Sequence, residues 1–474
     1  MAKSNGPDLT HLQDCIDDTT AGFLDGDSGP ADPTNYHELL GRLIPAREKF
    51  PPLYQTDFVD PFTHKLREMG DGKFNQVLVH DPQRVRGAGL MLDLSQAVLQ
   101  RGDSYELNPT NAFQQLVDDL YDGFLSAEDR KGVAPPENAT DAPLIKWGNP
   151  ASGPYTWPID ACRSFNVAAA VVNLPPSHAR RALLGWGALG HETAGHDVLH
   201  AYAGLEDQLA VAVRNALQKT FPGTSVLPDY WADRIDETAS DVMGILNMGP
   251  AAAIGVIGYF RGLNAALGNG SKLSNEGPAN DEHPADIVRG YLAAETVRQL
   301  SFKGATAWAK SLTEQTEADV TGITLVGHKV TKADAEKSAQ IVAETIVTTP
   351  LPTLEGHTLG SIQDWRDADE AIVTSVIKKL PTMADVPTTG TPRIYASHVV
   401  AAAILAALET GNIPTLFTRM LNVLDVMHKA NPSWGPLFVR HPGNMVRHFA
   451  YRRVTVHDLG QKTGLRAAAE IGDI

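Results

Sequence analysis

The residues best suited to chemistry lie together in the segment His191-Glu192-Thr193-Ala194-Gly195-His196. Catalytic zinc commonly takes three protein ligands from histidine and carboxylate side chains and leaves its fourth position to water. The usual pattern for two of these ligands is a pair of histidines four residues apart, which an α-helix places on one face. Here the two histidines are five residues apart. The residue types indicate a metal site, but the spacing requires an unusual helix.

The extra residue determines what that helix must look like. At about 100° per residue, five steps leave His191 and His196 about 140° apart on a regular helix, too far to share one ion. A π-bulge accommodates one additional residue and would bring both histidines onto the same face; such bulges are frequent at functional sites. Gly195 lies within the turn that must deform, and glycine adopts such a conformation at little steric cost. The sequence therefore predicts a helix distorted near Gly195.

A third ligand is expected from the run Asp236-Glu237-Thr238-Ala239-Ser240-Asp241, which has helical spacing and apolar neighbours. Glu237 and Asp241 are four residues apart, so on a helix they point in the same direction. Glu237 can bind the metal while Asp241 accepts a hydrogen bond from the far nitrogen of a ligand histidine, which fixes the tautomer and orientation of the ring.

These two motifs together resemble those of the gluzincin metallopeptidases, in which a helical HExxH is followed by a helix carrying E-x-x-x-D. The expanded HExxxH spacing is similar to the variant motif of the dipeptidyl peptidase III family. The resemblance is confined to the two motif helices. It implies that His191, His196 and Glu237 are zinc ligands, that Glu192 is the general base, and that the chain is a zinc-dependent hydrolase, a peptidase acting on a peptide or small amide substrate.

The chemistry of the residues is consistent with those implied roles. Bound zinc lowers the pKa of water from 15.7 towards roughly 7, and Glu192 can accept the proton and deliver it to the leaving amine. A further donor is needed for the oxyanion. The candidates are His283, Tyr230, Arg289 and Tyr291, of which we favour His283 because a polar loop delivers it to the start of a helix.

Two alternatives remain open at this point. Glu192, His196 and His200 are spaced i, i+4 and i+8, so an undistorted helix would align them, and two histidines with a carboxylate also suit non-haem Fe²⁺. The chain can also be an inactive metal-binding structural protein. An ordinary surface helix is disfavoured, because the ionisable groups from His191 to His200 crowd an otherwise apolar helix and need partners or a metal if they are buried.

Composition excludes several other classes of protein. The 474 residues carry a formal net charge of −16, which argues against a nucleic-acid partner because phosphates call for a basic surface. Cys15 and Cys162 are the only cysteines, too few for a disulfide framework. The N-terminus has no apolar secretory segment, and no apolar run approaches the ~20 residues of a membrane span. We therefore expect a cytoplasmic protein that does not enter membranes; its oligomeric state is left open.

The elements that must position these residues are expected to be mainly α, an α+β arrangement with few strands. Residues 1–36, rich in Asp, Gly, Pro, Ser and Thr, are predicted to be a disordered tail. Residues 37–159 form an N-terminal region, 160–300 the metal-binding catalytic core, and 301–474 a C-terminal helical region. A helix is predicted to start at Ser177 and to run through His191 to Tyr202. Residues 165–173 can be a strand or a helix end, and 322–330 a hairpin.

Overall fold

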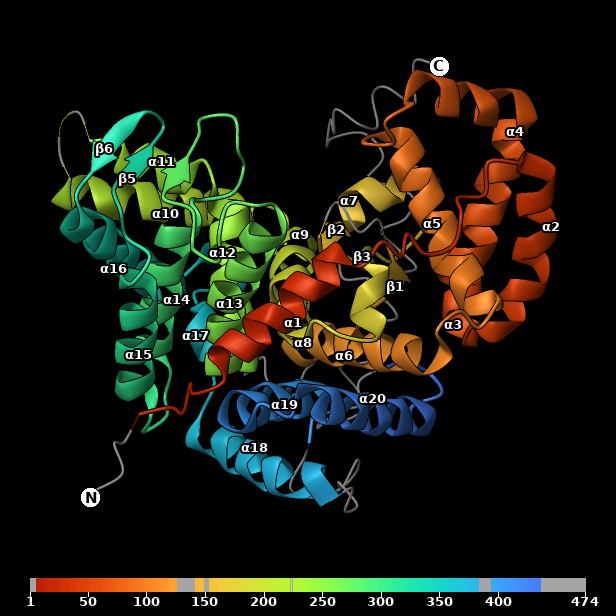
Figure 1. Cartoon of the computed structure of the whole chain (residues 1–474). Coiled ribbons are helices and arrows are strands. Elements are labelled where there is room, and N and C mark those ends of the chain that lie inside the picture. The colour runs from red at the N-terminus through yellow and green to blue at the C-terminus, as the bar shows by residue number, and fades with distance from the viewer. Residues whose placement is uncertain are drawn as a thin grey trace.

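The computed structural model describes residues 6–125, 141–148, 153–221, 223, 225–382 and 394–435. Helices dominate this part of the chain, and its strands form two small three-stranded sheets. The prediction of a mainly α protein with few strands is therefore confirmed (Figure 1). Among the described residues, no helix combines the length and the apolar character that crossing a membrane requires.

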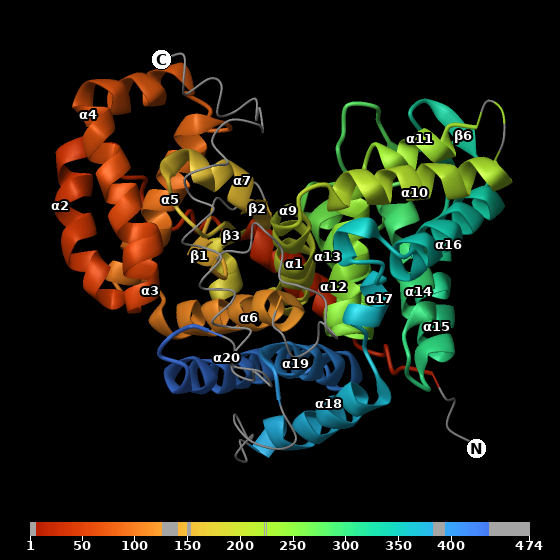
Figure 2. The same ribbon diagram turned by 180° about the vertical axis from the view of Figure 1, so that it is seen from behind.

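Two hydrophobic cores lie side by side. The smaller core is formed mainly by three helices near the N-terminus, α2 (Tyr36–Ala46), α4 (Asp60–His80) and α5 (Gly87–Gly102). The larger core contains side chains from all three of the regions expected within 37–474. Figure 2 shows α2, α4 and α5 at one end of the molecule and the helices of the larger core at the other.

The larger core is built from long helices whose apolar residues are spaced so that they lie on one or more faces of each helix. They are α6 (Leu107–Leu125), α10 (Leu205–Thr220), α12 (Ile235–Met248), α13 (Pro250–Ala266), α14 (Asp286–Gln299), α15 (Ala305–Glu317), α16 (Lys332–Thr348), α18 (Asp367–Lys379), α19 (Ala396–Thr410) and α20 (Ile413–Ala430). Within the described residues, the short α-helices are α3 (Pro52–Tyr54), α7 (Ile159–Cys162), α8 (Leu183–Gly187), α9 (Val198–Ala201), α11 (Leu227–Ala232) and α17 (Leu359–Ile362). Residues 436–474, the last part of the expected C-terminal region, lie outside the described residues.

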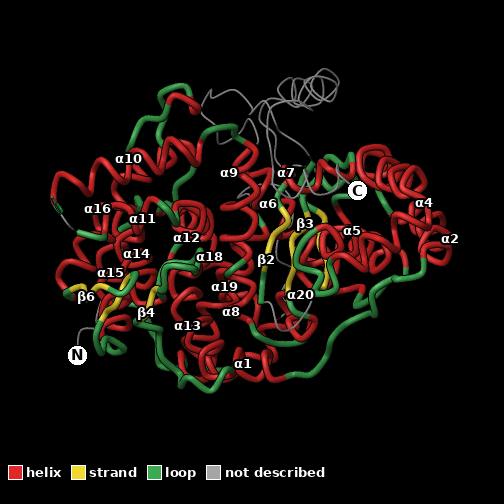
Figure 3. The backbone as a smooth tube through the Cα atoms, turned by 90° about the horizontal axis from the view of Figure 1, so that it is seen from above, coloured by secondary structure: helices red, strands yellow, loops and turns green. Residues whose placement is uncertain are grey.

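A small sheet separates the two cores. Strand β1 (Leu144–Trp147) runs parallel to β3 (Val171–Leu174), and β2 (Tyr155–Trp157) pairs antiparallel with the other side of β3. Because successive side chains point to opposite faces of a strand, Val171 packs into the smaller core and Val172 into the larger one. The order β1-β3-β2 leaves β2 at an edge, and Figure 3 shows these strands between the two groups of helices.

The structure decides the local alternatives that the sequence left open. Within residues 165–173, the chain is a strand from Val171 onward, preceded by a short 3-10 turn, Arg163–Phe165. The hairpin expected at 322–330 is present as β5 (Ile323–Leu325) and β6 (His328–Val330), with β4 (Glu276–Gly277) parallel to β5. The helix expected from Ser177 to Tyr202 is instead divided, since a 3-10 turn (Pro176–Ala179) is separated from α8 by Ala182, which has a φ of 61°.

The predicted disordered tail over residues 1–36 is wrong for its central part. Residues Leu12–Leu24 form helix α1, which packs against α8 and α13 (Figure 1). Leu12, Cys15, Ile16 and Thr19 are buried on its inner face. They follow the i, i+3, i+4, i+7 spacing of an amphipathic helix. The sequence therefore contains a helical pattern here, but the surrounding Asp, Gly and Pro residues favoured an interpretation as disorder.

This packing gives a direct test of the role of α1. Ile16 is 1% exposed, so Ile16→Ala is expected to lower the free energy of unfolding by about 2–5 kcal/mol, the usual cost of removing a buried isoleucine side chain. Gln13→Ala, on the exposed side of the same helix, should change it by less than about 0.5 kcal/mol. Equilibrium denaturation of the two variants compares them, and equal stability would mean that α1 contributes nothing to the larger core.

Candidate metal centre

The segment that carries both histidines is a π-helix. It spans Gly190–Asp197 and continues directly into α9. In a π-helix the hydrogen bonds run from residue i to i+5, so residues five apart lie above one another. The predicted distortion is thus confirmed, and it extends over the whole motif rather than over a single turn at Gly195.

Glycines allow this π-helix to lie unusually close to α12. A Cβ atom on Gly195 would fall 2.5 Å from the Cα of Ser240, and one on Gly244 would fall 2.8 Å from the carbonyl carbon of Gly190. Such distances leave no room for a methyl group, so the two backbones are in contact at both points. Gly195 is therefore required by the approach of α12, which brings Glu237 to the histidines.

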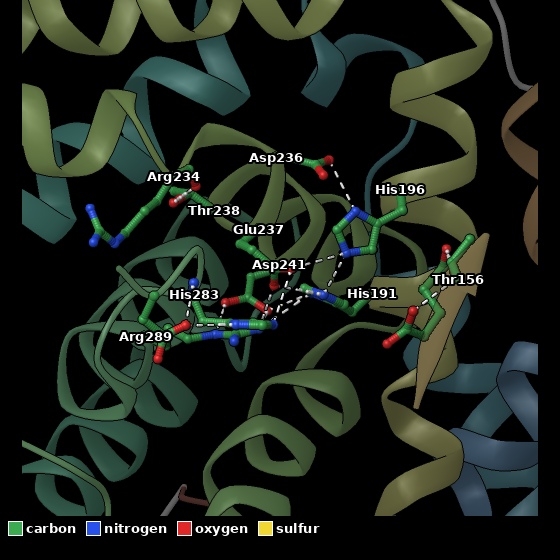
Figure 4. Close-up of polar contacts among 12 residues, drawn as sticks. Thr156, His191, His196, Arg234, Asp236, Glu237, Thr238, Asp241, His283 and Arg289 are labelled. Atoms are coloured by element: carbon green, nitrogen blue, oxygen red, sulfur yellow. Dashed lines mark hydrogen bonds and ion pairs between the residues drawn. The ribbon is translucent and has the colours of Figure 1, made fainter. Parts of the chain in front are cut away.

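Three ligand atoms meet where the π-helix and α12 touch (Figure 4). The Nε2 atoms of His191 and His196 are 3.0 Å apart. Glu237 Oε2 lies 3.2 Å from His191 Nε2, and Glu237 Oε1 lies 3.5 Å from His196 Nε2. Four ligands arranged tetrahedrally at zinc distances of about 2.0–2.1 Å are about 3.3 Å from one another. The contacts, two of which use different oxygens of Glu237, are close to that spacing, so the three side chains can surround one metal ion.

Each histidine contacts a carboxylate through Nδ1, the ring nitrogen that faces away from the triangle. His191 Nδ1 lies 2.8 Å from Asp241 Oδ1, and His196 Nδ1 lies 3.0 Å from Asp236 Oδ1. When each Nδ1–H is donated to its carboxylate, the Nε2 lone pairs point into the triangle, the tautomer that a metal ligand needs. Asp241 occupies the supporting position expected for it. Sequence reasoning gave no role to Asp236, although that residue immediately precedes Glu237.

The electrostatics of the triangle favour a positive charge. Burial opposes protonation of His191, but the contacts with Asp241 and Glu237 outweigh it and raise its pKa to about 9. The pKa of His196 is also raised, because Asp236 and Glu237 outweigh burial. Glu237 Oε2 is buried and accepts no hydrogen bond. The two Nε2 atoms, 3.0 Å apart, repel one another through their lone pairs unless a proton or a metal cation lies between them. The donor set therefore fits either protonated histidines or a divalent metal.

A buried arginine fixes the support of His191. Arg289 of α14 is 3% exposed, and its Nε and Nη2 atoms each lie 2.7 Å from one oxygen of Asp241. This two-point pair orients the carboxylate rigidly, while the guanidinium packs over the ring of Phe260. Arg289, considered from sequence as an oxyanion donor, is instead engaged with Asp241.

The loop before α14 brings His283 to the rim of the triangle. Its Nε2 lies 3.3 Å from Glu237 Oε1, its Nδ1 lies 3.0 Å from Asp281, and its side chain is 56% exposed. Tyr230 accepts a hydrogen bond from the backbone nitrogen of Ala285, and so braces the end of this loop. Of the four candidate donors, two contact the triangle: His283, and Arg289, whose Nη2 lies 3.7 Å from Glu237 Oε2. His283 is the exposed one of the two, whereas Arg289 and Tyr291 are buried.

Glu192, which follows His191 in the π-helix, is buried and is held by a residue that sequence reasoning missed. Its Oε2 accepts a hydrogen bond of 2.8 Å from the hydroxyl of Thr156, in the edge strand β2. Thr156 is 36 residues distant in sequence, and its contact depends on how β2 pairs with β3. No local signal in the sequence identifies it.

The alternative set of Glu192, His196 and His200 is not brought together. His200 Nδ1 lies 3.2 Å from Asp160, and its Nε2 lies 3.7 Å from Asp236. The π-helix removes the regular i, i+4, i+8 alignment on which that set depends. Within the described residues, His191, His196 and Glu237 are the one group of His, Cys, Asp and Glu side chains whose ligand atoms converge sufficiently to hold a metal ion.

Comparison of the chain with protein-family models, with curated proteins and with solved structures found no match, so the case for a function depends on the geometry of this centre.

Proposed function

We propose that this chain is a zinc-dependent hydrolase that cleaves peptide or closely related amide bonds. The observation that supports the proposal is the convergence of His191, His196 and Glu237, whose side chains approach one another to 3.0, 3.2 and 3.5 Å, the last two through different oxygens of Glu237. Two histidines and one glutamate leave the fourth zinc position open, as in hydrolytic sites and unlike the four-ligand structural sites.

Bound zinc supplies two effects, a lowered pKa of the attacking water and polarisation of the substrate carbonyl. The chain supplies the proton transfers. Glu192 directly follows the ligand His191, and its carboxylate can take up a proton from the attacking water and pass it to the departing amine. Thr156 donates to Oε2 of Glu192 and fixes the orientation of that carboxylate. His283 can donate from Nε2 to the substrate oxygen as negative charge develops there.

The edge strand supports a peptide as the substrate. Strand β2 is at the edge of its sheet, and its central residue, Thr156, contacts Glu192. An edge strand presents backbone N–H and C=O groups in the arrangement that an extended peptide can pair with. A peptide lying along β2 would pass close to the general base.

Metal analysis tests the proposal. Protein purified without added metal is expected to contain about one zinc per chain, measured by inductively coupled plasma mass spectrometry. His191→Ala and Glu237→Gln should lower the zinc content at least about tenfold, because each removes one of three ligands. His200→Ala is the matched control, since His200 is a neighbouring, carboxylate-bound histidine outside the triangle; it should retain zinc.

Different results would support other functions. Iron in place of zinc, together with loss of metal from His200→Ala, would overturn the zinc proposal and favour a non-haem iron centre. Circular dichroism of each variant separates loss of the ligand from loss of the fold. Full zinc occupancy without cleavage of any peptide in a broad fluorogenic set would favour a metal-binding protein without hydrolytic activity.

A further inference from the structure

A buried polar cluster links the N-terminal helices to strand β2. Asp93 of α5 is its centre and is 8% exposed. One carboxylate oxygen pairs with the amine of Lys146 in β1. The other accepts hydrogen bonds of 2.7 Å from the hydroxyl of Tyr155 and of 2.7 Å from the indole nitrogen of Trp157, both in β2. Three side chains from two strands therefore bind one helix carboxylate.

The positions of these side chains follow the alternation of a strand. Tyr155 and Trp157 are two residues apart and share one face of β2, whereas Thr156 between them points to the other face. Asp93 thus holds β2 from one side, and the hydroxyl of Thr156 meets Glu192 on the opposite side. The residues on both sides of Thr156 are fixed by the same carboxylate.

Strand β2 is also held through its backbone: Asn173 donates to the carbonyl oxygen of Tyr155, and the thiol of Cys162 donates to that of Trp157. It pairs with β3 over three residues, along one edge. The ring of Trp157 packs against the smaller core, and its Cζ2 atom would lie 3.5 Å from a Cβ on Gly89 of α5. The contacts of β2 with α5 therefore supplement a short ladder of backbone hydrogen bonds. Through these contacts β2 is attached to the smaller core.

We propose that Asp93, with Lys146, Tyr155 and Trp157, is a positioning device for the general base. It fixes β2 at the place from which Thr156 orients the carboxylate of Glu192. The cluster touches neither the metal triangle nor the proposed base directly, so its effect passes through Thr156. This inference depends on the proposed function, because it assigns these residues to the reaction that Glu192 would perform.

Conservative variants test the device without exposing a buried charge. Trp157→Phe and Tyr155→Phe each remove one donor to Asp93 and keep an aromatic ring. We expect faster amide hydrogen exchange in a peptide spanning residues 153–160, measured by mass spectrometry, with zinc content unchanged. For the fluorogenic peptide cleaved best by the wild-type chain, kcat should fall about tenfold, because small displacements of a catalytic group are costly. KM should change less than kcat.

A double-mutant cycle distinguishes this positioning from general loosening. Thr156→Val removes the hydroxyl that contacts Glu192 and should itself lower kcat. If the cluster acts through Thr156, adding Trp157→Phe to Thr156→Val should lower kcat by less than about twofold more, since coupled residues are non-additive. Equal effects of Trp157→Phe in both backgrounds would overturn the proposal, because the cluster would then act by another route.

Trp365→Phe is the matched control. Trp365 also donates its indole N–H to a carboxylate, that of Glu370, and it is buried. It should leave both kcat and the exchange of residues 153–160 unchanged. Unchanged exchange of this segment in both Trp157→Phe and Tyr155→Phe would overturn the positioning device, whatever the activity. Absence of peptide cleavage by the wild-type chain would instead overturn the proposed function.

Discussion

Replacing Glu192 by glutamine is expected to leave zinc bound and to lower peptide hydrolysis by roughly 10²–10⁴-fold, the usual contribution of a general acid–base group. Glutamine has nearly the same shape, and its amide oxygen can still accept the hydrogen bond from Thr156. It cannot take up a proton from water near neutral pH. The change therefore removes the proton transfer and leaves the three ligands in place.

The measurements are zinc content and kcat on the same preparation. Glu295→Gln is a suitable control, because Glu295 is buried to a similar degree, 5% against 6% exposed, and is paired with Arg298 of its own helix. It should retain activity. Loss of zinc from Glu192→Gln would show that Glu192 is a ligand, as in the alternative set with His196 and His200. Retained hydrolysis would remove the role of Glu192 as the base.

The spacing of the histidines, together with the assumption that both bind one metal ion, predicted the distortion that the π-helix shows. Two ligands five residues apart cannot share an ion on a regular helix, so a shared metal ion requires the local distortion. The i, i+4 relation of Glu237 and Asp241 similarly placed both carboxylates on the side of α12 that faces the histidines, where Asp241 meets His191. Both predictions concern residues close together in the sequence, whose relative directions are determined by the periodicity of the helix.

Contacts between distant elements could not be predicted in the same way. Thr156 reaches Glu192 only because β2 joins the edge of β3, and Arg289 reaches Asp241 only because α14 packs on α12. Neither pairing leaves a periodic signal in the sequence. Gly195 also has a role that the sequence did not predict, since its small size permits the close approach of Ser240.

Gly195→Ala is expected to displace α12 from the π-helix and so to disturb the metal ligands. The added Cβ would lie 2.5 Å from both the Cα and the Cβ of Ser240. The Cα belongs to the backbone of α12 and cannot rotate away, so the helix must shift relative to the π-helix. Glu237 is three residues before Ser240 on α12, and a shift of that helix would enlarge the ligand triangle. We expect zinc affinity to fall at least about tenfold and stability to fall by about 1–3 kcal/mol, as in other overpacked cores.

Two further substitutions serve as controls for Gly195→Ala. Gly255→Ala adds the same methyl group to the buried helix α13, where the nearest atom would be 3.6 Å away. It should keep zinc and be at least as stable as the wild type, because alanine is the better helix former. Ser240→Gly should not rescue Gly195→Ala, since the Ser240 Cα remains in place. Isothermal titration with zinc and thermal unfolding measure both effects. Wild-type zinc affinity in Gly195→Ala would mean that the contact between the two helices is not what brings Glu237 to His191 and His196.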